Sequence, residues 1–211
     1  RFNFAGSYSL KSGSCIARLS SDGKLDSTFG NNALGANNNV YQVALQADGK
    51  ILVCGAFTTV NGTSAVRIAR LTATGALDPT FSAGAGFNAS ALAMQPQSDG
   101  KIVVGGSFTT YNTASAQTLV RLNSDGSRDD SFTLVPNNSV GGIARQVDGR
   151  LVIVGYFYGI GTSYRFGVAR INVDGSLDAG LNPLPLFPGT VNALLPLPGG
   201  KVLVGGDFQF L

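Results

Sequence analysis

The stretch QADGKILVCGAFT at residues 46–58 joins an Asp-Gly pair to an apolar segment, and the chain repeats this phrase. Further copies read QSDGKIVVGGSFT at 97–109, QVDGRLVIVGYFY at 146–158 and LPGGKVLVGGDFQ at 197–209, while FAGSY at 4–8 matches the end of another. The glycine before the aromatic residue recurs at Gly6, Gly55, Gly106, Gly155 and Gly206. A period of about 50 residues is typical of propellers and solenoids, in which one unit cannot bury its apolar face alone.

A second phrase lies between these copies and shares their period. It reads IARLSSDGKLDSTF at 16–29, IARLTATGALDPTF at 68–81, LVRLNSDGSRDDSF at 119–132 and VARINVDGSLDAGL at 168–181. Together the two phrases divide the chain into repeats at about 40–81, 90–132 and 140–181, with partial copies at about 1–30 and 190–211. We therefore treat residues 1–211 as one repeat domain.

One unit is predicted to hold four short strands, at about 41–46, 50–57, 66–71 and 77–81. Asp48-Gly49 joins the first two strands. An Asp-Gly pair between apolar runs indicates a hairpin, because glycine accepts the positive φ that the turn requires. Each unit is therefore predicted to be an antiparallel meander.

The segment 50–57 decides how the units stack. Ile51, Val53 and Phe57 fall on one side of a strand, and Leu52 and Cys54 fall on the other. Because both faces are apolar, neither can face water, and a neighbouring unit must cover each. The sequence therefore predicts an all-β fold, a β-propeller of four-stranded antiparallel blades with about four to five blades represented. A helical fold is disfavoured because no stretch of helix length combines freedom from glycine with a 3.6-residue period.

Charge and hydropathy argue against several partners. Charged residues make up only 13% of the chain, against about 25% in typical globular domains. The net charge of +3 is spread along the chain without a basic run, which argues against nucleic-acid binding. The longest uncharged stretch, residues 179–200, contains five prolines and cannot form a membrane helix. We expect no nucleic-acid partner and no membrane insertion.

Metal and cofactor chemistry is not expected either. The chain has no histidine, which excludes a histidine-based triad, and its cysteines lack the spacing of a zinc site. Cys15 and Cys54 lie in different repeats and are expected to be free, although a single bridge between them stays open. The aspartates of the turns lack the D-x-[DN]-x-[DN]-G spacing of calcium loops.

The two phrases, in the pattern QxDGKILVGGxF followed by ARLNxDGSLDxxF, resemble the delta-60 repeat. This is a bacterial β-propeller repeat family of large cell-surface and secreted proteins. The resemblance covers essentially the whole chain, and Leu181 departs from it by replacing the last aromatic residue. It implies a β-propeller in an extracellular or cell-surface setting, and it implies neither a common activity nor catalytic residues.

Arginine and aspartate recur at fixed places in the second phrase. The arginines are Arg18, Arg70, Arg121 and Arg170, and the aspartates are Asp26, Asp78, Asp129 and Asp178. A buried arginine needs a carboxylate or carbonyl partner to offset its desolvation. We expect structural ion pairs, within one blade or between adjacent blades, rather than a ring of ligands.

Binding is expected where the repeats differ. Antiparallel strands would place the short Asp-Gly turns at one end of each blade and the longer, variable loops at the other. Variable loops on a rigid scaffold are a usual place for binding. The candidate ligand-binding residues in these loops are Asn32, Asn38, Asn61, Tyr111, Asn112, Tyr158 and Tyr164. Amide and aromatic side chains suit contacts to a glycan or a protein, although asparagine is also an ordinary loop residue.

The sequence favours a non-enzymatic extracellular module for adhesion or for binding a glycan or protein. One alternative is a structural spacer in a large surface protein or fibre. A glycan lyase or hydrolase is less favoured, because the loops offer no pair of carboxylates apart from the repeat pattern. The chain begins inside one copy of the first phrase and ends just after another, so we expect it to be part of a larger propeller flanked by further repeats or domains.

Overall fold

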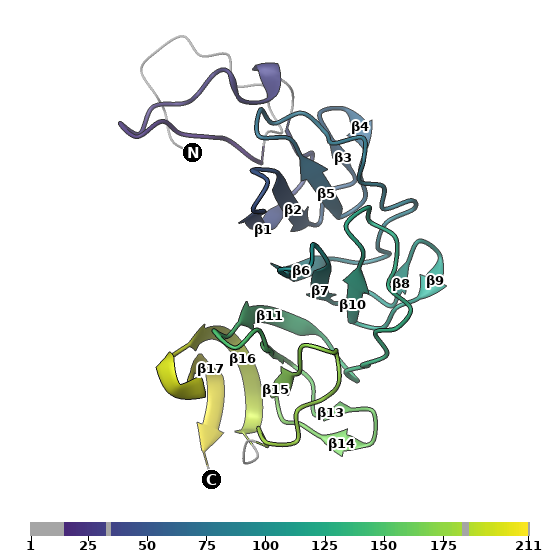
Figure 1. The fold of residues 1–211 in the computed structure, drawn as a ribbon, viewed down its shortest axis with the longest axis vertical. Coiled ribbons are helices and arrows are strands. Elements are labelled where there is room, and N and C mark those ends of the chain that lie inside the picture. The colour runs from purple at the N-terminus through teal and green to yellow at the C-terminus, as the bar shows by residue number, and fades with distance from the viewer. Residues whose placement is uncertain (1–14, 33–34, 183–185, 211) are drawn as a thin grey trace.

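The computed structural model describes residues 15–32, 35–182 and 186–210, and its strands form three successive sheets followed by a hairpin (Figure 1). Unit 1 (residues 35–81) contains β1 (Val40–Leu45), β2 (Ile51–Gly55) and β5 (Ile68–Leu71). Unit 2 (residues 82–132) contains β6 (Ala91–Pro96), β7 (Ile102–Gly106) and β10 (Leu119–Leu122). Unit 3 (residues 133–182) contains β11 (Val140–Arg145), β12 (Leu151–Gly155) and β15 (Val168–Ile171).

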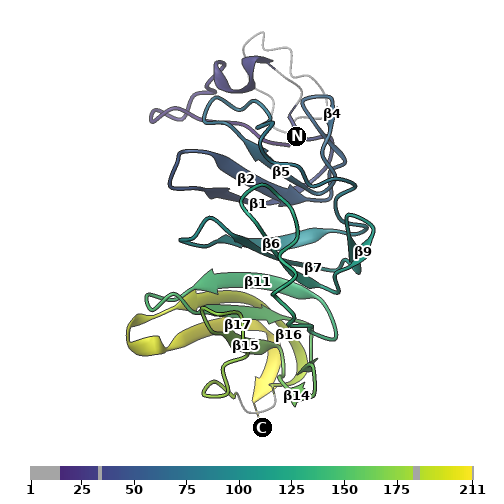
Figure 2. The same ribbon diagram turned by 45° about the vertical axis from the view of Figure 1, so that its right-hand side comes forward.

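Two partial units flank these three. Residues 15–32, the N-terminal half-unit, contain an isolated bridge between Leu19 and Leu25 and the short 3-10 helix η1 (Phe29–Asn32). The C-terminal hairpin consists of β16 (Leu186–Pro196), the 3-10 turn η2 (Pro198–Gly200) and β17 (Val202–Phe210). Figures 1 and 2 place these parts at opposite ends of a curved row of units. The predicted all-β class is confirmed, and no helix of the described residues is long and apolar enough to cross a membrane.

The turn between the first two strands of each unit forms as predicted. Gly49 has φ 81°, and its N–H donates to the carbonyl of Gln46 at 3.0 Å. Asp48 Oδ1 accepts a hydrogen bond from the Lys50 N–H at 3.1 Å. The aspartate thus satisfies the turn backbone while the glycine adopts the left-handed conformation.

The predicted fourth strand is reduced to a single bridge. In unit 1 Leu71 bridges Leu77, and the Asp78 N–H then donates to the Arg70 carbonyl. The next residues turn away, because Asp78 Oδ1 accepts from the Thr80 N–H and Pro79 has no N–H to extend a ladder. Each full unit is therefore a three-stranded sheet with one bridge, and the prediction of a fourth strand was wrong in its length.

Each full unit also contains a short hairpin, which forms a two-stranded sheet of its own. It follows the second strand of each unit and lies on the outside of the curved row (Figure 1). The hairpins are β3 (Thr59–Val60) with β4 (Thr63–Ser64), β8 (Thr110–Tyr111) with β9 (Ala114–Ser115), and β13 (Gly159–Ile160) with β14 (Ser163–Tyr164). In the first, Asn61 and Gly62 both have positive φ, as a two-residue type I′ turn requires.

The second strand of each unit is covered on both faces, as its apolar pattern predicts. Leu52 and Cys54 of β2 pack with Met94 of unit 2 in one core cluster. Val53 belongs to another cluster, against which Ile16 of the N-terminal half-unit packs. Within the unit, the repeat glycine lets the backbone at the start of the first strand approach the second, because a Cβ on Gly55 would lie 2.1 Å from the carbonyl oxygen of Asn39. The cores therefore lie between units, as the stacking of propeller blades requires.

Candidate functional site

The recurring arginine and aspartate of each unit form an ion pair at the sheet edge. Arg70 Nε lies 2.7 Å from Asp78 Oδ2, and both side chains are buried. The equivalent distances are 2.6 Å for Arg121–Asp129, 2.6 Å for Arg170–Asp178 and 2.8 Å for the more exposed pair Arg18–Asp26. Each arginine therefore pairs with the aspartate eight residues later in its own unit.

A third charged residue joins each full unit's pair, and the sequence reasoning did not single it out. Lys50 Nζ lies 3.0 Å from Asp78 Oδ2. The equivalent contacts are Lys101 to Asp129 and Arg150 to Asp178, both at 2.7 Å. The available signal was the basic residue that follows every first Asp-Gly turn. Its recurrence beside the recurring aspartate makes the network part of the repeat.

Hydrogen bonding keeps these carboxylates ionised. Burial alone would raise the pKa of Asp78, but hydrogen bonds from Thr80, Lys50 and Arg70 outweigh it and hold the pKa well below its usual range. Both carboxylate oxygens are engaged, because Oδ1 takes Thr80 and Oδ2 takes the two cations. Such a carboxylate is a structural anion and a poor general acid or base at neutral pH.

The arginines also join neighbouring units. Arg70 Nη1 donates to the Ser124 carbonyl in unit 2, and Arg18 Nη1 donates to the Ala73 carbonyl in unit 1 at 2.7 Å. The Arg70 guanidinium lies 5.1 Å from the centroid of the Phe81 ring, a cation–π geometry. The Arg70 guanidinium therefore contacts only groups of the fold, and through it the ion pair of unit 1 is joined to unit 2.

Three asparagines that were not candidates tie the loops together. Asn37 Oδ1 accepts from the N–H groups of Thr58 and Thr59 at 2.8 and 3.0 Å. The equivalent residues are Asn88 and Asn137, whose Oδ1 atoms take the same two contacts in units 2 and 3. Their constant position ahead of the repeat glycine was the signal in the sequence. They confirm that the loop before the first strand and the loop after the second lie at the same end.

Three of the candidate ligand-binding residues make contacts within the fold. Tyr111 is buried, and its hydroxyl donates to the carbonyl of Gly126. Asn61 accepts from the Gly35 N–H at 3.1 Å and donates to the Gly75 carbonyl at 3.0 Å. Asn112 accepts from the Ala85 N–H at 3.0 Å. The reason is the outer hairpin, whose tip folds toward the following Asp-Gly-type turn, so these loops are not free at the far end of the blade as predicted.

The remaining candidates have different surroundings. Asn38 is exposed and accepts from the adjacent Asn39 N–H at 2.7 Å. Asn32 ends η1, and its side chain lies outside the part of the chain that the structure describes. Tyr158 and Tyr164 are exposed. The pairing of Gly159 with Tyr164 places these tyrosines on opposite faces of the β13–β14 hairpin.

Unit 3 exposes an aromatic edge that units 1 and 2 lack. Tyr156 is exposed beside Tyr158, and it was not a candidate. The two flank buried Phe157 in the segment between β12 and β13. The corresponding residues are Ala56 and Thr58 in unit 1 and Ser107 and Thr109 in unit 2. A comparison of aligned repeats would have found this departure.

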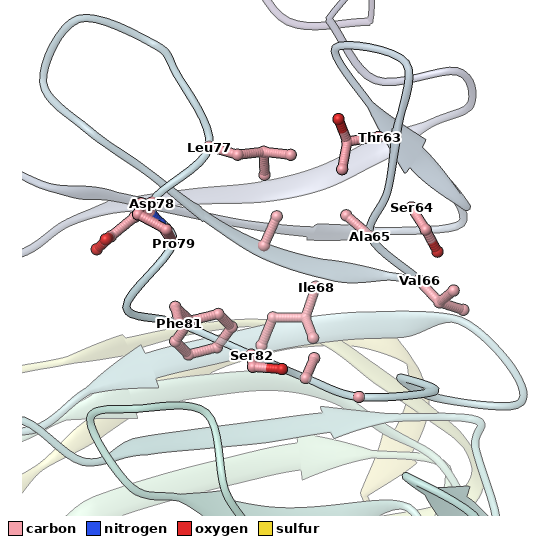
Figure 3. Close-up of a pocket in the computed structure, with 13 residues that line it drawn as sticks. Thr63, Ser64, Ala65, Val66, Ile68, Leu77, Asp78, Pro79, Phe81 and Ser82 are labelled. Atoms are coloured by element: carbon pink, nitrogen blue, oxygen red, sulfur yellow. The ribbon is translucent and has the colours of Figure 1, made fainter.

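A pocket of about 310 Å³ lies between β4–β5 of unit 1 and residues 77–84, which lead into unit 2 (Figure 3). Thr63 and Ser64 bring hydroxyl groups to it, and Ile68 and Phe81 bring apolar surface. Asp78 is the one carboxylate among its lining residues, and the ion pairs described above already engage it. The pocket therefore offers hydrogen-bonding groups but no pair of carboxylates for acid and base catalysis.

The two cysteines are not bonded to each other. Cys15 is exposed and Cys54 is buried, and both are free. Burial raises the pKa of the Cys54 thiol to about 12, so it stays protonated and behaves as a small apolar side chain. The single bridge left open by the sequence is absent.

Known folds resemble this one at low sequence identity. The extracellular domain of BT4673 from B. thetaiotaomicron, described as a one component system, aligns with a TM-score of 0.53 and 14% identity. The alignment covers 89% of this chain and 23% of that one. XC5397 from Xanthomonas campestris, a gluconolactonase, aligns with a TM-score of 0.51 and 19% identity over 91% of this chain and 62% of that one. The chain thus spans less than two thirds of either protein, and these likenesses show the fold alone.

Sequence comparison identifies the family of the chain. No curated protein sequence matches the chain. The family model described as "Domain of unknown function (DUF5122) beta-propeller" matches residues 4–29, 46–81, 97–132 and 146–181, which together exceed half of the chain. These matches coincide with the two recurring phrases and with the stacked units. The chain belongs to the DUF5122 β-propeller family.

Proposed function

We propose that this chain is a non-enzymatic binding module of the bacterial cell exterior, and that Tyr156 and Tyr158 contact its glycan or protein ligand. The observation that carries the proposal is the exposed aromatic edge of unit 3, which replaces small side chains of the other units. Aromatic rings supply flat apolar area for stacking on sugars, and the tyrosine hydroxyls supply hydrogen bonds.

The backbone holds this edge rigidly. The Tyr156 N–H donates to the Ser139 carbonyl at 3.0 Å, and the Tyr158 N–H donates to Asn137 Oδ1 at 3.1 Å. Phe157 anchors the segment in the core between units 2 and 3. A contact surface that is already ordered loses little conformational entropy when a ligand binds.

The proposed setting has two supports. The resemblance to the delta-60 repeat implies secreted and cell-surface proteins, and the similar domain of BT4673 is described as extracellular. The non-enzymatic assignment is supported by the carboxylates of the three full units, whose repeated members are engaged in ion pairs.

Glycan-array and bacterial-surface binding test this function. We expect binding by the unaltered chain and a loss of about five- to thirtyfold in affinity for Tyr156→Ala and for Tyr158→Ala, because each ring contributes on the order of 1–2 kcal/mol. Val173→Ala, an exposed apolar residue of a turn, is the matched surface control and should bind normally.

Other results would point elsewhere. Equal affinity for the tyrosine variants and for Val173→Ala would move the contact surface away from unit 3. If the folded chain bound none of the glycans or surfaces, the result would favour the spacer alternative. Turnover of a glycan or lactone would overturn the non-enzymatic assignment.

A further inference from the structure

Unit 3 buries an arginine that has no carboxylate partner among the described residues. The buried arginines of the described chain are Arg70, Arg121 and Arg165. The first two pair with Asp78 and Asp129 at 2.7 and 2.6 Å. Arg165 is 8% exposed and takes part in no ion pair of the described chain. Its guanidinium is therefore a buried charge without a counter-charge.

The rest of the sequence holds no anion for this arginine. Residues 1–14, 33–34, 183–185 and 211, which the structure does not describe, contain neither aspartate nor glutamate. The guanidinium also stays protonated when it is buried, because its pKa is above about 12. A buried ion that lacks a partner is strongly unfavourable. An anionic group of a ligand would supply the partner that this chain does not.

The side-chain hydrogen bonds of Arg165 leave one edge of its guanidinium unused. Nη1 donates to the Tyr164 carbonyl at 2.7 Å and to Asn182 Oδ1 at 3.1 Å. Nε is enclosed and has no partner, and Nη2 has none among the described residues but is not enclosed. Nε and Nη2 form the edge of the planar group that a carboxylate contacts with both oxygens. Because Asn182 is exposed, this edge lies just below the surface, and a carboxylate can approach Nη2 from solvent.

The repeat does not require an arginine at this place. Ala65 of unit 1 and Ala116 of unit 2 occupy the equivalent position. Ala65 and Ser82 both line the pocket of Figure 3, and their equivalents in unit 3 are Arg165 and Asn182, which are joined by a hydrogen bond. Unit 3 therefore places a positive charge where unit 1 has a pocket.

The residues around Arg165 depart from the repeat as well. The segment YRF at 164–166 stands where unit 1 has SAV at 64–66 and unit 2 has SAQ at 115–117. Its two aromatic rings are stacked, with centroids 6.3 Å apart. Arg165 lies opposite Tyr158, because its N–H donates to the Tyr158 carbonyl at 3.0 Å. The uncompensated charge and the aromatic edge of unit 3 are thus neighbours in the structure.

We propose that Arg165 binds the carboxylate of an acidic sugar, so that the ligand of unit 3 is a glycan that contains uronic acid. The inference rests on the proposed function, in which Tyr156 and Tyr158 contact the same ligand. Aromatic rings stack on the apolar faces of sugars, and the guanidinium forms charge-assisted hydrogen bonds with the carboxylate. A uronic acid offers both groups in one residue, whereas an acidic peptide offers the carboxylate without a sugar face.

Matched pairs of oligosaccharides test the role of the charge. Short oligomers of galacturonate, of mannuronate and of hyaluronan are compared with their methyl esters, which keep the sugar and lose the charge. In calorimetry, the unaltered chain should bind at least one acidic oligomer about tenfold or more tightly than its ester. Arg165→Ala restores the residue of units 1 and 2 and should bind the acid and the ester alike. Lys201→Ala removes an exposed cation of the C-terminal hairpin and should keep the preference.

The outcomes separate this inference from the proposed function. The absence of any preference for the acids, or a preference that survives Arg165→Ala, would overturn the inference. Binding of neutral glycans that depends on Tyr156 would still leave the proposed function standing. A preference that Arg165→Ala removes and the tyrosine variants leave intact would support the carboxylate site and refute the tyrosine contacts. Equal affinity for a polyglutamate peptide would overturn the assignment to a sugar.

Thermal stability separates a ligand contact from a role in folding. Arg121→Ala removes an arginine that is paired with a carboxylate and should lower the melting temperature. Arg165→Ala removes an uncompensated charge along with its two hydrogen bonds, so its melting temperature should fall less. A saturating acidic oligomer should raise the melting temperature of the unaltered chain and leave that of Arg165→Ala unchanged. Equal falls for the two variants, without an effect of the oligomer on either chain, would assign Arg165 to the fold and overturn the inference.

Discussion

At the scale of single residues, the repeated charges are explained by folding rather than by binding. A buried guanidinium is tolerated because a carboxylate, a neighbouring carbonyl and an aromatic ring surround it, as Arg70 shows with Asp78, Ser124 and Phe81. Folding also explains the loop asparagines, because their side-chain amides mostly form hydrogen bonds with backbone groups. We therefore expect ligand contacts from residues that do not recur in every unit.

Asp78→Ala should destabilise the chain by about 3 kcal/mol or more, because it leaves the buried Arg70 without its carboxylate. Chemical denaturation would measure the loss. Asp130→Ala is the control, since Asp130 is largely exposed and pairs at the surface with Arg128, and a change of at most about 1 kcal/mol is expected. Equal effects would show that the Arg70–Asp78 pair contributes nothing beyond a surface pair.

The acid sensitivity of the fold follows from the lowered pKa of Asp78. A carboxyl whose pKa is depressed by folding adds stability above its ordinary value of 3.8, and that stability is lost as the pH falls below this value. The stability gap between the unaltered chain and Asp78→Asn should therefore be constant near neutral pH and narrow below about pH 4. Denaturation curves between pH 7 and pH 2 would test this, and a gap that widens in acid would contradict it.

At the scale of elements, the repeat glycine sets how closely the first two strands of a unit approach, because a Cβ there would meet the backbone at the start of the first strand. The aspartate after the bridge turns the chain away from the sheet. The repeat glycine and this aspartate are each single positions in the sequence, but the residues that they contact include residues of other segments.

Gly55→Ala should destabilise the chain by at least about 2 kcal/mol, because the added Cβ would lie 2.1 Å from the Asn39 carbonyl oxygen and the strands must separate. Gly205→Ala is the matched control, since its nearest neighbour is the Ala193 Cβ at 3.8 Å. Thermal melts would compare the stabilities of the two variants. An unchanged melting temperature for Gly55→Ala would show that the strands can separate without loss of stability.

Asn61→Ala should cost about 2–3 kcal/mol, because it removes two hydrogen bonds and places alanine at φ 52°. Asn61→Gly removes the same bonds but suits the positive φ, so it should cost less. Equal losses in urea denaturation would mean that the turn conformation contributes little.

At the scale of the whole molecule, stability is shared between neighbouring units. Each core cluster joins two adjacent units, so the middle of the row has two neighbours and the ends have fewer. This is the arrangement of a repeat protein, in which stability is a sum over units and junctions.

Amide hydrogen exchange should therefore be slowest in β7 and fastest in β17, which has a free edge among the described strands. Exchange would be measured by mass spectrometry. Uniform protection along the row would contradict a sum of local junctions.

The sequence alone determined the repeat, the all-β class, the Asp-Gly turns and the two-sided burial of strands such as β2. These follow from periodicity and local conformational preference, which a single unit expresses by itself. The pairing of Arg70 with Asp78 was also foreseeable, because a repeated arginine that is buried needs a repeated anion.

Which loop residues are exposed to solvent depends on tertiary contacts. Tyr111 and Tyr158 look alike in the sequence, yet Tyr111 packs in the core between units 1 and 2 and Tyr158 is exposed. Whether each tyrosine is buried depends on where the outer hairpin folds and on which carbonyl groups lie beneath its tip. Those distances join residues from separate segments, and no local pattern encodes them. Exposure is therefore a property of the neighbours that a residue has in the fold and not of the residue alone.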